Sequence, residues 1–91
     1  MLLRWTPAAA ADLQSINIYL KENHPQYHQA TVRRLYDMIQ SLKQFPMRGR
    51  PGREAGTREL PFTPLPYIAV YRVKGENIEV LRIYHGARQL P

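Results

Sequence analysis

Apolar residues recur with two different periods along the chain. In the first half they lie three or four positions apart, in two stripes: Ala9, Leu13, Ile16 and Leu20, followed by Val32, Leu35, Ile39, Leu42 and Phe45. This spacing gathers apolar side chains on one face of a helix, because a helix makes one turn in about 3.6 residues. The first half of the chain is therefore predicted to form two amphipathic helices.

Local signals mark where these helices begin and end. Thr6 followed by Pro7 is typical of a helix start. The threonine hydroxyl can accept a hydrogen bond from a free backbone N–H of the first turn, and proline has no N–H that would lack a partner there. Asn23 suits a helix end, and Pro25 suits the first turn of a second helix. Pro46 cannot continue that second helix. A tight turn therefore joins the two predicted helices into a hairpin.

In the second half the period falls to two, which is typical of strands. The segments TRELPF (57–62), PYIAVYRV (66–73) and IEVLRIYH (78–85) have this pattern, with a hairpin turn at KGEN (74–77). MLLRW, at the start of the chain, is a further short apolar strand. The basic segment PMRGRPGREAG (46–56), rich in glycine and proline, is predicted to be a mobile loop.

The order of these elements, β-α-α-β-β-β, predicts an α+β fold in which the helical hairpin packs on one face of a mostly antiparallel four-stranded sheet. With 91 residues, the chain is expected to form one domain, residues 1–91. The sequence contains no stretch that fits a membrane span or a signal peptide. It also contains no cysteine, which is compatible with a reducing cytoplasm.

The charge is basic and unevenly distributed. Thirteen lysines and arginines against seven acids give a net charge of +6. Residues 1–47 carry five bases and three acids, whereas residues 48–91 carry eight bases and four acids. Seven of the bases in the second half are arginines, whose planar guanidinium groups suit phosphate or carboxylate. An anionic partner is therefore expected, either nucleic acid or an acidic protein.

Strand alternation predicts which side chains share a face of the sheet. In the last strand one face would carry Ile78, Val80, Arg82 and Tyr84, and the other Leu81, Ile83 and His85. In the preceding strand, Tyr67 and Arg72 fall on opposite faces. Because one face must cover the helices, the other is expected to expose arginine and tyrosine, a combination that also suits stacking on nucleic-acid bases.

Other catalytic and ligand-binding patterns are weak. His24 and His28 lie four residues apart, a spacing that can bind zinc, but no third ligand is evident. No glycine-rich loop opens a helix after a strand, so no phosphate-binding motif is present. We therefore expect no metal and no cofactor.

Several short motifs, in order along the chain, carry a family resemblance. They are W-T-P-x-A-x-x-D-L (5–13), FPxxGR (45–50), GTREL (56–60), PYIAVYRV (66–73) and HGARQLP (85–91). With them the chain resembles toxins of the RelE/ParE superfamily, and more closely the ParE branch. The resemblance spans nearly the full chain and implies two helices packed on an antiparallel sheet. It also implies a bacterial toxin of a type II toxin-antitoxin system, held inactive in a hetero-oligomer with a cognate ParD-like antitoxin.

Two activities exist within the resembled superfamily. ParE-like toxins bind DNA gyrase and stabilise its cleaved complex with DNA, whereas RelE-like toxins cut mRNA on the ribosome without a metal. A gyrase toxin would use its cations as contacts, and the candidate target-binding residues are Arg58, Tyr67, Arg72, Arg82, His85 and Arg88. An endoribonuclease would need a proton donor and acceptor with cations around the phosphate, and its candidates are Arg58, Arg82 and His85. Tyr67 occupies the position of a middle-strand arginine in the nucleases, which favours the gyrase interpretation and a protein that is not an enzyme.

The antitoxin is expected to dock on the helical hairpin and on an open edge of the sheet. A chain of this size cannot bury all of its helix tyrosines and both stripes, so apolar surface should remain for a partner. The candidate antitoxin-binding residues are Leu13, Ile16, Tyr19, Leu20, Tyr36 and Ile39. A third interpretation, outside the toxins that act on gyrase or mRNA, is a small basic module that binds nucleic acid or protein.

Overall fold

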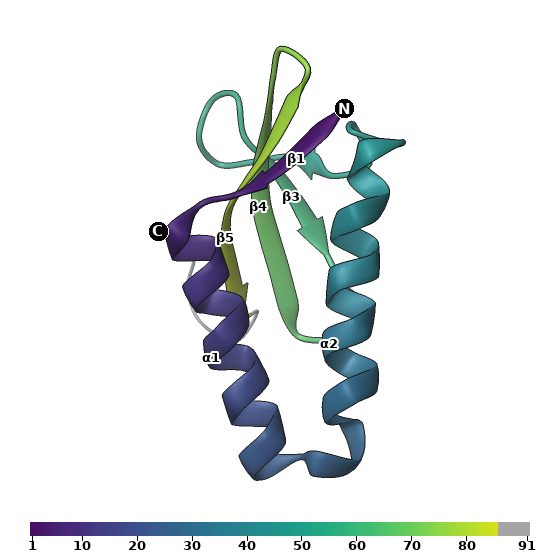
Figure 1. Ribbon diagram of the computed structural model, residues 1–91. Coiled ribbons are helices and arrows are strands. Elements are labelled where there is room, and N and C mark those ends of the chain that lie inside the picture. The colour runs from purple at the N-terminus through teal and green to yellow at the C-terminus, as the bar shows by residue number, and fades with distance from the viewer. Residues whose placement is uncertain (86–91) are drawn as a thin grey trace.

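The computed structural model describes residues 1–85 (Figure 1). Its elements, in chain order, are β1 (Leu2–Trp5), α1 (Pro7–Asn23), α2 (Pro25–Gln40), the 3-10 turn η1 (Ser41–Lys43), β2 (Arg50–Pro51), β3 (Arg58–Pro61), β4 (Tyr67–Lys74) and β5 (Asn77–His85). The predicted α+β class is confirmed, and the predicted helices and strands occur in the predicted order.

The sheet has five strands in the order β1-β5-β4-β3-β2. β1 lies parallel to β5, and the other neighbours are antiparallel. The prediction of four strands was therefore one strand short. The additional strand, β2, pairs Arg50 with Glu59 and Pro51 with Arg58, and it lies inside the segment predicted to be a loop.

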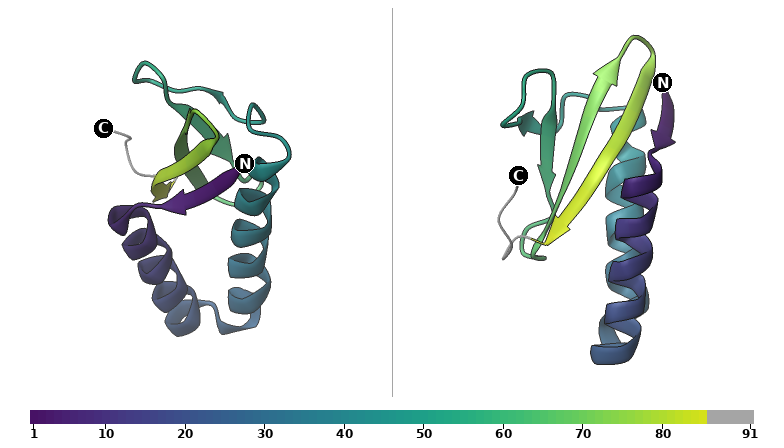
Figure 2. Two further views of the ribbon diagram at one scale, coloured as in Figure 1. Left: turned by 45° about the horizontal axis from the view of Figure 1, so that its top comes forward. Right: turned by 90° about the vertical axis from the view of Figure 1, so that its left-hand side faces the viewer.

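The two helices lie side by side on one face of the sheet, and the other face is open (Figure 2). Thr6 caps α1 as predicted, since its hydroxyl accepts from the Ala9 N–H at 3.1 Å. Asn23 ends α1, and Pro25 begins α2. The second helix is shorter than its apolar stripe predicts: α2 ends at Gln40, and Phe45 is exposed instead of packed in the core.

The hydrophobic core lies between the helices and the covered face of the sheet. Its fully buried side chains come from both helix stripes, from β4 and β5, and from the residue that follows β3: Ala9, Leu35, Ile39, Leu42, Phe62, Ala69, Tyr71, Ile78 and Val80. Their burial removes apolar surface from water and supplies the main driving force for folding. The open face of the sheet contributes little to this core.

A bulge in β5 changes the predicted alternation. Tyr71 pairs with Val80 and Val70 pairs with Arg82, so Leu81 is an extra residue without a partner of its own. A bulge shifts every later side chain to the opposite face. Ile83 is therefore buried with Val80 on the covered face, contrary to the prediction that the two would lie on opposite faces.

The segment predicted to be a mobile loop is held against the core by Tyr71 of β4. The Tyr71 hydroxyl donates to the Pro46 carbonyl at 2.7 Å and accepts from the Gly49 N–H at 2.8 Å. A Cβ on Gly49 would lie 2.7 Å from the Tyr71 ring and 2.8 Å from the Glu59 carbonyl, so this close approach requires glycine. This packing explains why glycine occupies position 49, the G of FPxxGR.

Candidate functional site

The open face of the sheet carries a row of cationic side chains held in place by acids. Arg72 on β4 and Glu79 on β5 are directly opposite each other in the sheet, and their Nε–Oε1 distance is 2.6 Å. The hydrogen bond from Arg72 lowers the pKa of the Glu79 carboxyl, which therefore stays ionised near neutral pH. Both side chains remain accessible to solvent. This pair presents a guanidinium with a fixed orientation to solvent.

Arg82 is fixed more firmly than Arg72. Its Nε and Nη2 donate to the two carboxylate oxygens of Asp12 on α1 at 2.7 and 3.1 Å. This bidentate geometry suits the planar guanidinium. The same carboxylate accepts from the Ile83 N–H at 2.9 Å. The guanidinium carbon also lies 5.0 Å from the centre of the Tyr84 ring, within the range of a cation–π contact. The contact with Asp12 raises the pKa of Arg82.

Asp12 and Thr6 together hold the bulge of β5. β1 pairs with β5 only up to Val80, so the following backbone groups on that edge need other partners. The Thr6 hydroxyl donates to the Leu81 carbonyl at 2.9 Å, and Asp12 accepts from Ile83. The residues of W-T-P-x-A-x-x-D-L therefore join α1 to β5. Sequence reasoning missed this role of Asp12, although the position of Asp12 in the motif was a signal.

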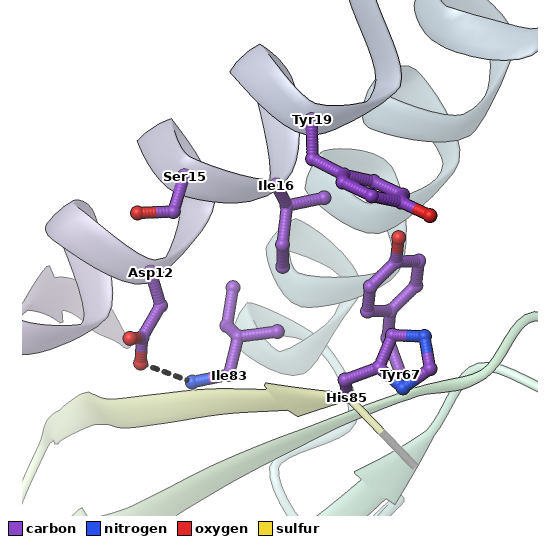
Figure 3. Close-up of a pocket in the computed structure, with 7 residues that line it drawn as sticks. All are labelled: Asp12, Ser15, Ile16, Tyr19, Tyr67, Ile83 and His85. Atoms are coloured by element: carbon purple, nitrogen blue, oxygen red, sulfur yellow. Dashed lines mark hydrogen bonds between the residues drawn. The ribbon is translucent and has the colours of Figure 1, made fainter. Parts of the chain in front are cut away.

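On the covered face, Tyr67 and His85 close one end of the gap between α1 and the sheet (Figure 3). They are register partners, and their rings meet edge to face with centroids 5.4 Å apart. A cavity of about 420 Å³ beside them is lined by Asp12, Ser15, Ile16, Tyr19, Tyr67, Ile83 and His85. Burial, and to a lesser extent Tyr19, raises the pKa of Tyr67, so its hydroxyl stays protonated and uncharged.

Tyr67 is buried, which does not suit its predicted role as a contact with the target. Its side chain is 4% exposed, because position 67 shares the covered face with Ala69 and Tyr71. It therefore offers almost no surface to a macromolecular target in this conformation. The prediction that Tyr67 and Arg72 lie on opposite faces is confirmed, since Arg72 is exposed.

The three residues predicted for a ribonuclease site do not converge. Arg58 pairs with Tyr71 in the sheet, and its Nη1 donates to the Gly49 carbonyl at 2.6 Å. His85 pairs with Tyr67, four positions from Tyr71 and hence about 13 Å away along the strand. Arg82 lies on the face opposite to His85, as the regular alternation after the bulge requires. Arg58 therefore holds the backbone of the loop, and the cluster expected for phosphate chemistry is not assembled. The predicted Arg88 contact lies outside the described residues.

The predicted antitoxin-binding residues divide by burial. Ile39 is fully buried and Leu20 nearly so, so neither is available to a partner in this conformation. Their stripes face the core, which is what an amphipathic helix requires. Leu13 and Ile16 are partly buried against the core. Tyr19 and Tyr36 are about half exposed and remain candidates for a helix-side contact.

Among residues 1–85 no three His, Asp or Glu side chains are arranged to hold a metal ion. His28 instead forms a hydrogen bond through Nε2 with Oδ1 of Asn17, which joins the two helices. Neither helix in this range is long and apolar enough to cross a membrane.

Comparison with known proteins identifies relatives along nearly the whole chain. The family described as "ParE toxin of type II toxin-antitoxin system, parDE" matches residues 3–90. Toxin RelE2 of Caulobacter vibrioides is 38% identical over 84 residues, which cover 92% of this chain and 93% of that protein. The Y4kP protein of Sinorhizobium fredii is 35% identical over 89 residues, covering 98% of this chain and 92% of that protein.

Solved structures give the same grouping. A chain from the chromosomal ParDE toxin-antitoxin system of P. aeruginosa superposes with a TM-score of 0.82 at 35% identity, covering 93% of this chain and 95% of that one. A chain of the E. coli DinJ-YafQ complex superposes with a TM-score of 0.65 at 13% identity, covering 93% of this chain and 92% of that one. At that level of identity the second similarity supports the fold only.

Proposed function

Because this chain belongs to the family of ParE toxins of type II toxin-antitoxin systems, we propose that it arrests bacterial growth by binding DNA gyrase in the cytoplasm and stabilising the complex in which gyrase has cut DNA. The contacts with the target are Arg72 and Arg82 on the open face, with Tyr84 beside Arg82. The observation that carries the proposal is the fixed orientation of these guanidinium groups, which Glu79 and Asp12 hold in place.

This arrangement of fixed guanidinium groups suits binding without bond cleavage. A guanidinium held in advance loses less side-chain entropy when it meets an anionic surface. Catalysis of RNA cleavage would need a proton acceptor, a proton donor and cations around one phosphate. Within residues 1–85, the candidates for those roles are separated by the sheet and by distance along it. The structure therefore supports a surface that recognises its target.

We further propose that a ParD-like antitoxin neutralises this chain by covering part of the helical hairpin, where Tyr19 and Tyr36 expose about half of their surface. The net charge of +6 favours an acidic segment in that antitoxin. An acidic segment that folds on binding could cover this surface.

The proposal is tested with purified components. The chain is added to gyrase and supercoiled plasmid, the reaction is stopped with detergent and protease, and linear DNA is measured on a gel. We expect linear DNA to accumulate with toxin concentration and to disappear when the cognate antitoxin is added first. No linear DNA at concentrations that arrest growth in cells would contradict the gyrase target.

A second candidate, the ribosome-dependent endoribonuclease, is favoured by one observation. His85 is half-buried against the ring of Tyr67 at the end of β5, and a histidine can transfer protons near neutral pH. This function predicts cut mRNA on translating ribosomes with the native chain and intact mRNA with His85→Ala. Linear plasmid DNA in the gyrase assay, together with intact mRNA in the ribosome assay, would reject the endoribonuclease function.

A further inference from the structure

An exposed apolar turn lies between η1 and β2. Phe45 and Met47 are 58% and 62% exposed, respectively, although the sequence pattern assigned Phe45 to the core stripe. With Pro46 and Arg48 they line a shallow recess in the surface. Single exposed apolar residues are ordinary, but a contiguous exposed aromatic and methionine pair is typical of contact surfaces. We refer to residues 45–48 as the Phe45–Arg48 turn.

The Phe45–Arg48 turn is held at both ends by hydrogen bonds. The Arg48 N–H donates to the Phe45 carbonyl at 3.1 Å, closing the turn, and the Phe45 N–H donates to the Ser41 carbonyl at 3.0 Å. The buried Tyr71 hydroxyl fixes the Pro46 carbonyl at 2.7 Å. The apolar side chains are therefore presented on a fixed backbone, which lowers the entropy lost when a partner binds.

The electrostatics around the turn point to an acidic partner. The Arg48 guanidinium donates to the Ser41 hydroxyl at 2.9 Å, and within residues 1–85 no carboxylate lies within salt-bridge distance of it. Lys43 and Arg50 are exposed nearby in the sequence. Of these two, only Arg50 has an acidic partner among residues 1–85, namely Glu59 at 3.2 Å. An apolar recess with an unneutralised cation complements a protein segment that carries an apolar side chain next to acidic residues.

The turn lies at the end of the molecule opposite the α1–α2 connection (Figure 1). We propose that the Phe45–Arg48 turn is a docking surface for an acidic, apolar segment of the toxin's target protein. An apolar side chain of that segment enters the recess lined by Phe45 and Met47, and Arg48 pairs with its acids. The antitoxin is assigned to the hairpin surface around Tyr19 and Tyr36 instead, so its binding distinguishes the two partners. This inference rests on the proposed toxin function, but not on the identification of the target as gyrase.

The test compares four variants with the native chain: Phe45→Ala combined with Met47→Ala, Arg48→Glu, and two controls. Ile18→Ala removes a similarly exposed apolar side chain from α1, and Lys21→Glu reverses an exposed charge there. Each is induced in cells, and surviving colonies are counted. We expect the double variant and Arg48→Glu to raise survival by about tenfold or more, as loss of a central contact does, and the controls to kill like the native chain.

Two additional measurements assign the cause. Thermal melting checks that each variant is folded. If the double variant is unfolded, Arg48→Glu alone tests the docking surface. Binding of the cognate antitoxin should be unchanged in the double variant and in Arg48→Glu. Growth arrest at the native level in folded double and Arg48→Glu variants would overturn the docking surface, as would a parallel loss of antitoxin binding. If the native chain arrests growth without trapping cleaved DNA on gyrase, while the variants lose growth arrest, the surface stands and the gyrase target fails. A native chain without toxicity would overturn both.

Discussion

The two faces of the sheet use the same strands for different purposes. On the covered face Tyr71, Ile78 and Val80 are completely buried under the helices. On the open face Arg72 and Arg82 stay accessible, each paired with an acid. The covered face therefore holds most of the folding energy, whereas exposed ion pairs contribute little stability.

This difference makes fold and function separable by substitution. Changes on the covered face should unfold the chain and abolish its activity only through unfolding. Changes on the open face should leave a folded protein that has lost its effect. Asp12 joins the two regions, because one carboxylate holds the backbone of β5 and the guanidinium of Arg82.

The largest effect is expected at Tyr71. Tyr71→Ala should lower the free energy of unfolding by about 3–5 kcal/mol, because it leaves a cavity in the core. Tyr71→Phe should cost about 1–3 kcal/mol, because it leaves the buried Gly49 N–H without its partner. Urea denaturation measures both values. Tyr84→Phe on the open face is the matched control and should be nearly neutral. Equal losses at positions 71 and 84 would contradict the contrast between the faces.

Asp12→Ala should come next, with a loss of about 1.5–3 kcal/mol, since hydrogen bonds to a charged group are lost. Asp12→Asn should cost less, because the amide oxygen can still accept from Ile83. A double-mutant cycle with Arg82→Ala, measured by urea denaturation, should show coupling between the two side chains. Asp37→Ala removes an exposed pair with Arg33 on α2 and should change stability by less than about 0.5 kcal/mol. Additive effects of the Asp12 and Arg82 changes would mean that their contact contributes nothing.

The smallest effect is expected from the pH dependence of the Arg72–Glu79 pair. The pKa of Glu79 is lower in the folded chain than in the unfolded one. Its contribution is therefore present above the unfolded pKa and is lost as the pH falls through the folded pKa. The melting temperature of the native chain should exceed that of Glu79→Gln slightly at pH 7, and the difference should vanish in strong acid. A difference that grows on acidification would contradict the pairing.

The parts of the fold that sequence predicted are those set by local signals. Thr6, Pro7, Asn23 and Pro25 fix helix ends through hydrogen bonds and proline geometry within a few residues. Phe45 was misplaced because the apolar period was extended past the residue where α2 ends. The β2 strand and the bulge at Leu81 depend on partners distant in sequence, which no local period encodes.

The candidate site was less predictable for the same reason. Alternation correctly placed Arg72 on the face opposite to Tyr67. It also correctly placed Arg82 and Tyr84 on one face. It could not identify Asp12, which contacts Arg82 across 70 positions of sequence. Tyr67 was expected at a target surface because tyrosine suits both rims and cores, and only the packing of α1 over the sheet resolves that ambiguity.

The central claim is that the open face binds gyrase without breaking bonds, and the yield of linear plasmid DNA tests it most directly. Gyrase and supercoiled plasmid are incubated with the native chain, with Arg72→Ala combined with Arg82→Ala, or with the exposed control Arg33→Ala. We expect linear DNA with the native chain and the control, and at least a roughly tenfold lower yield with the double variant, provided melting shows it to be folded. Equal yields from all three would contradict the role of the open face. No linear DNA from any of them, together with mRNA that the native chain cuts and His85→Ala does not, would contradict the claim itself.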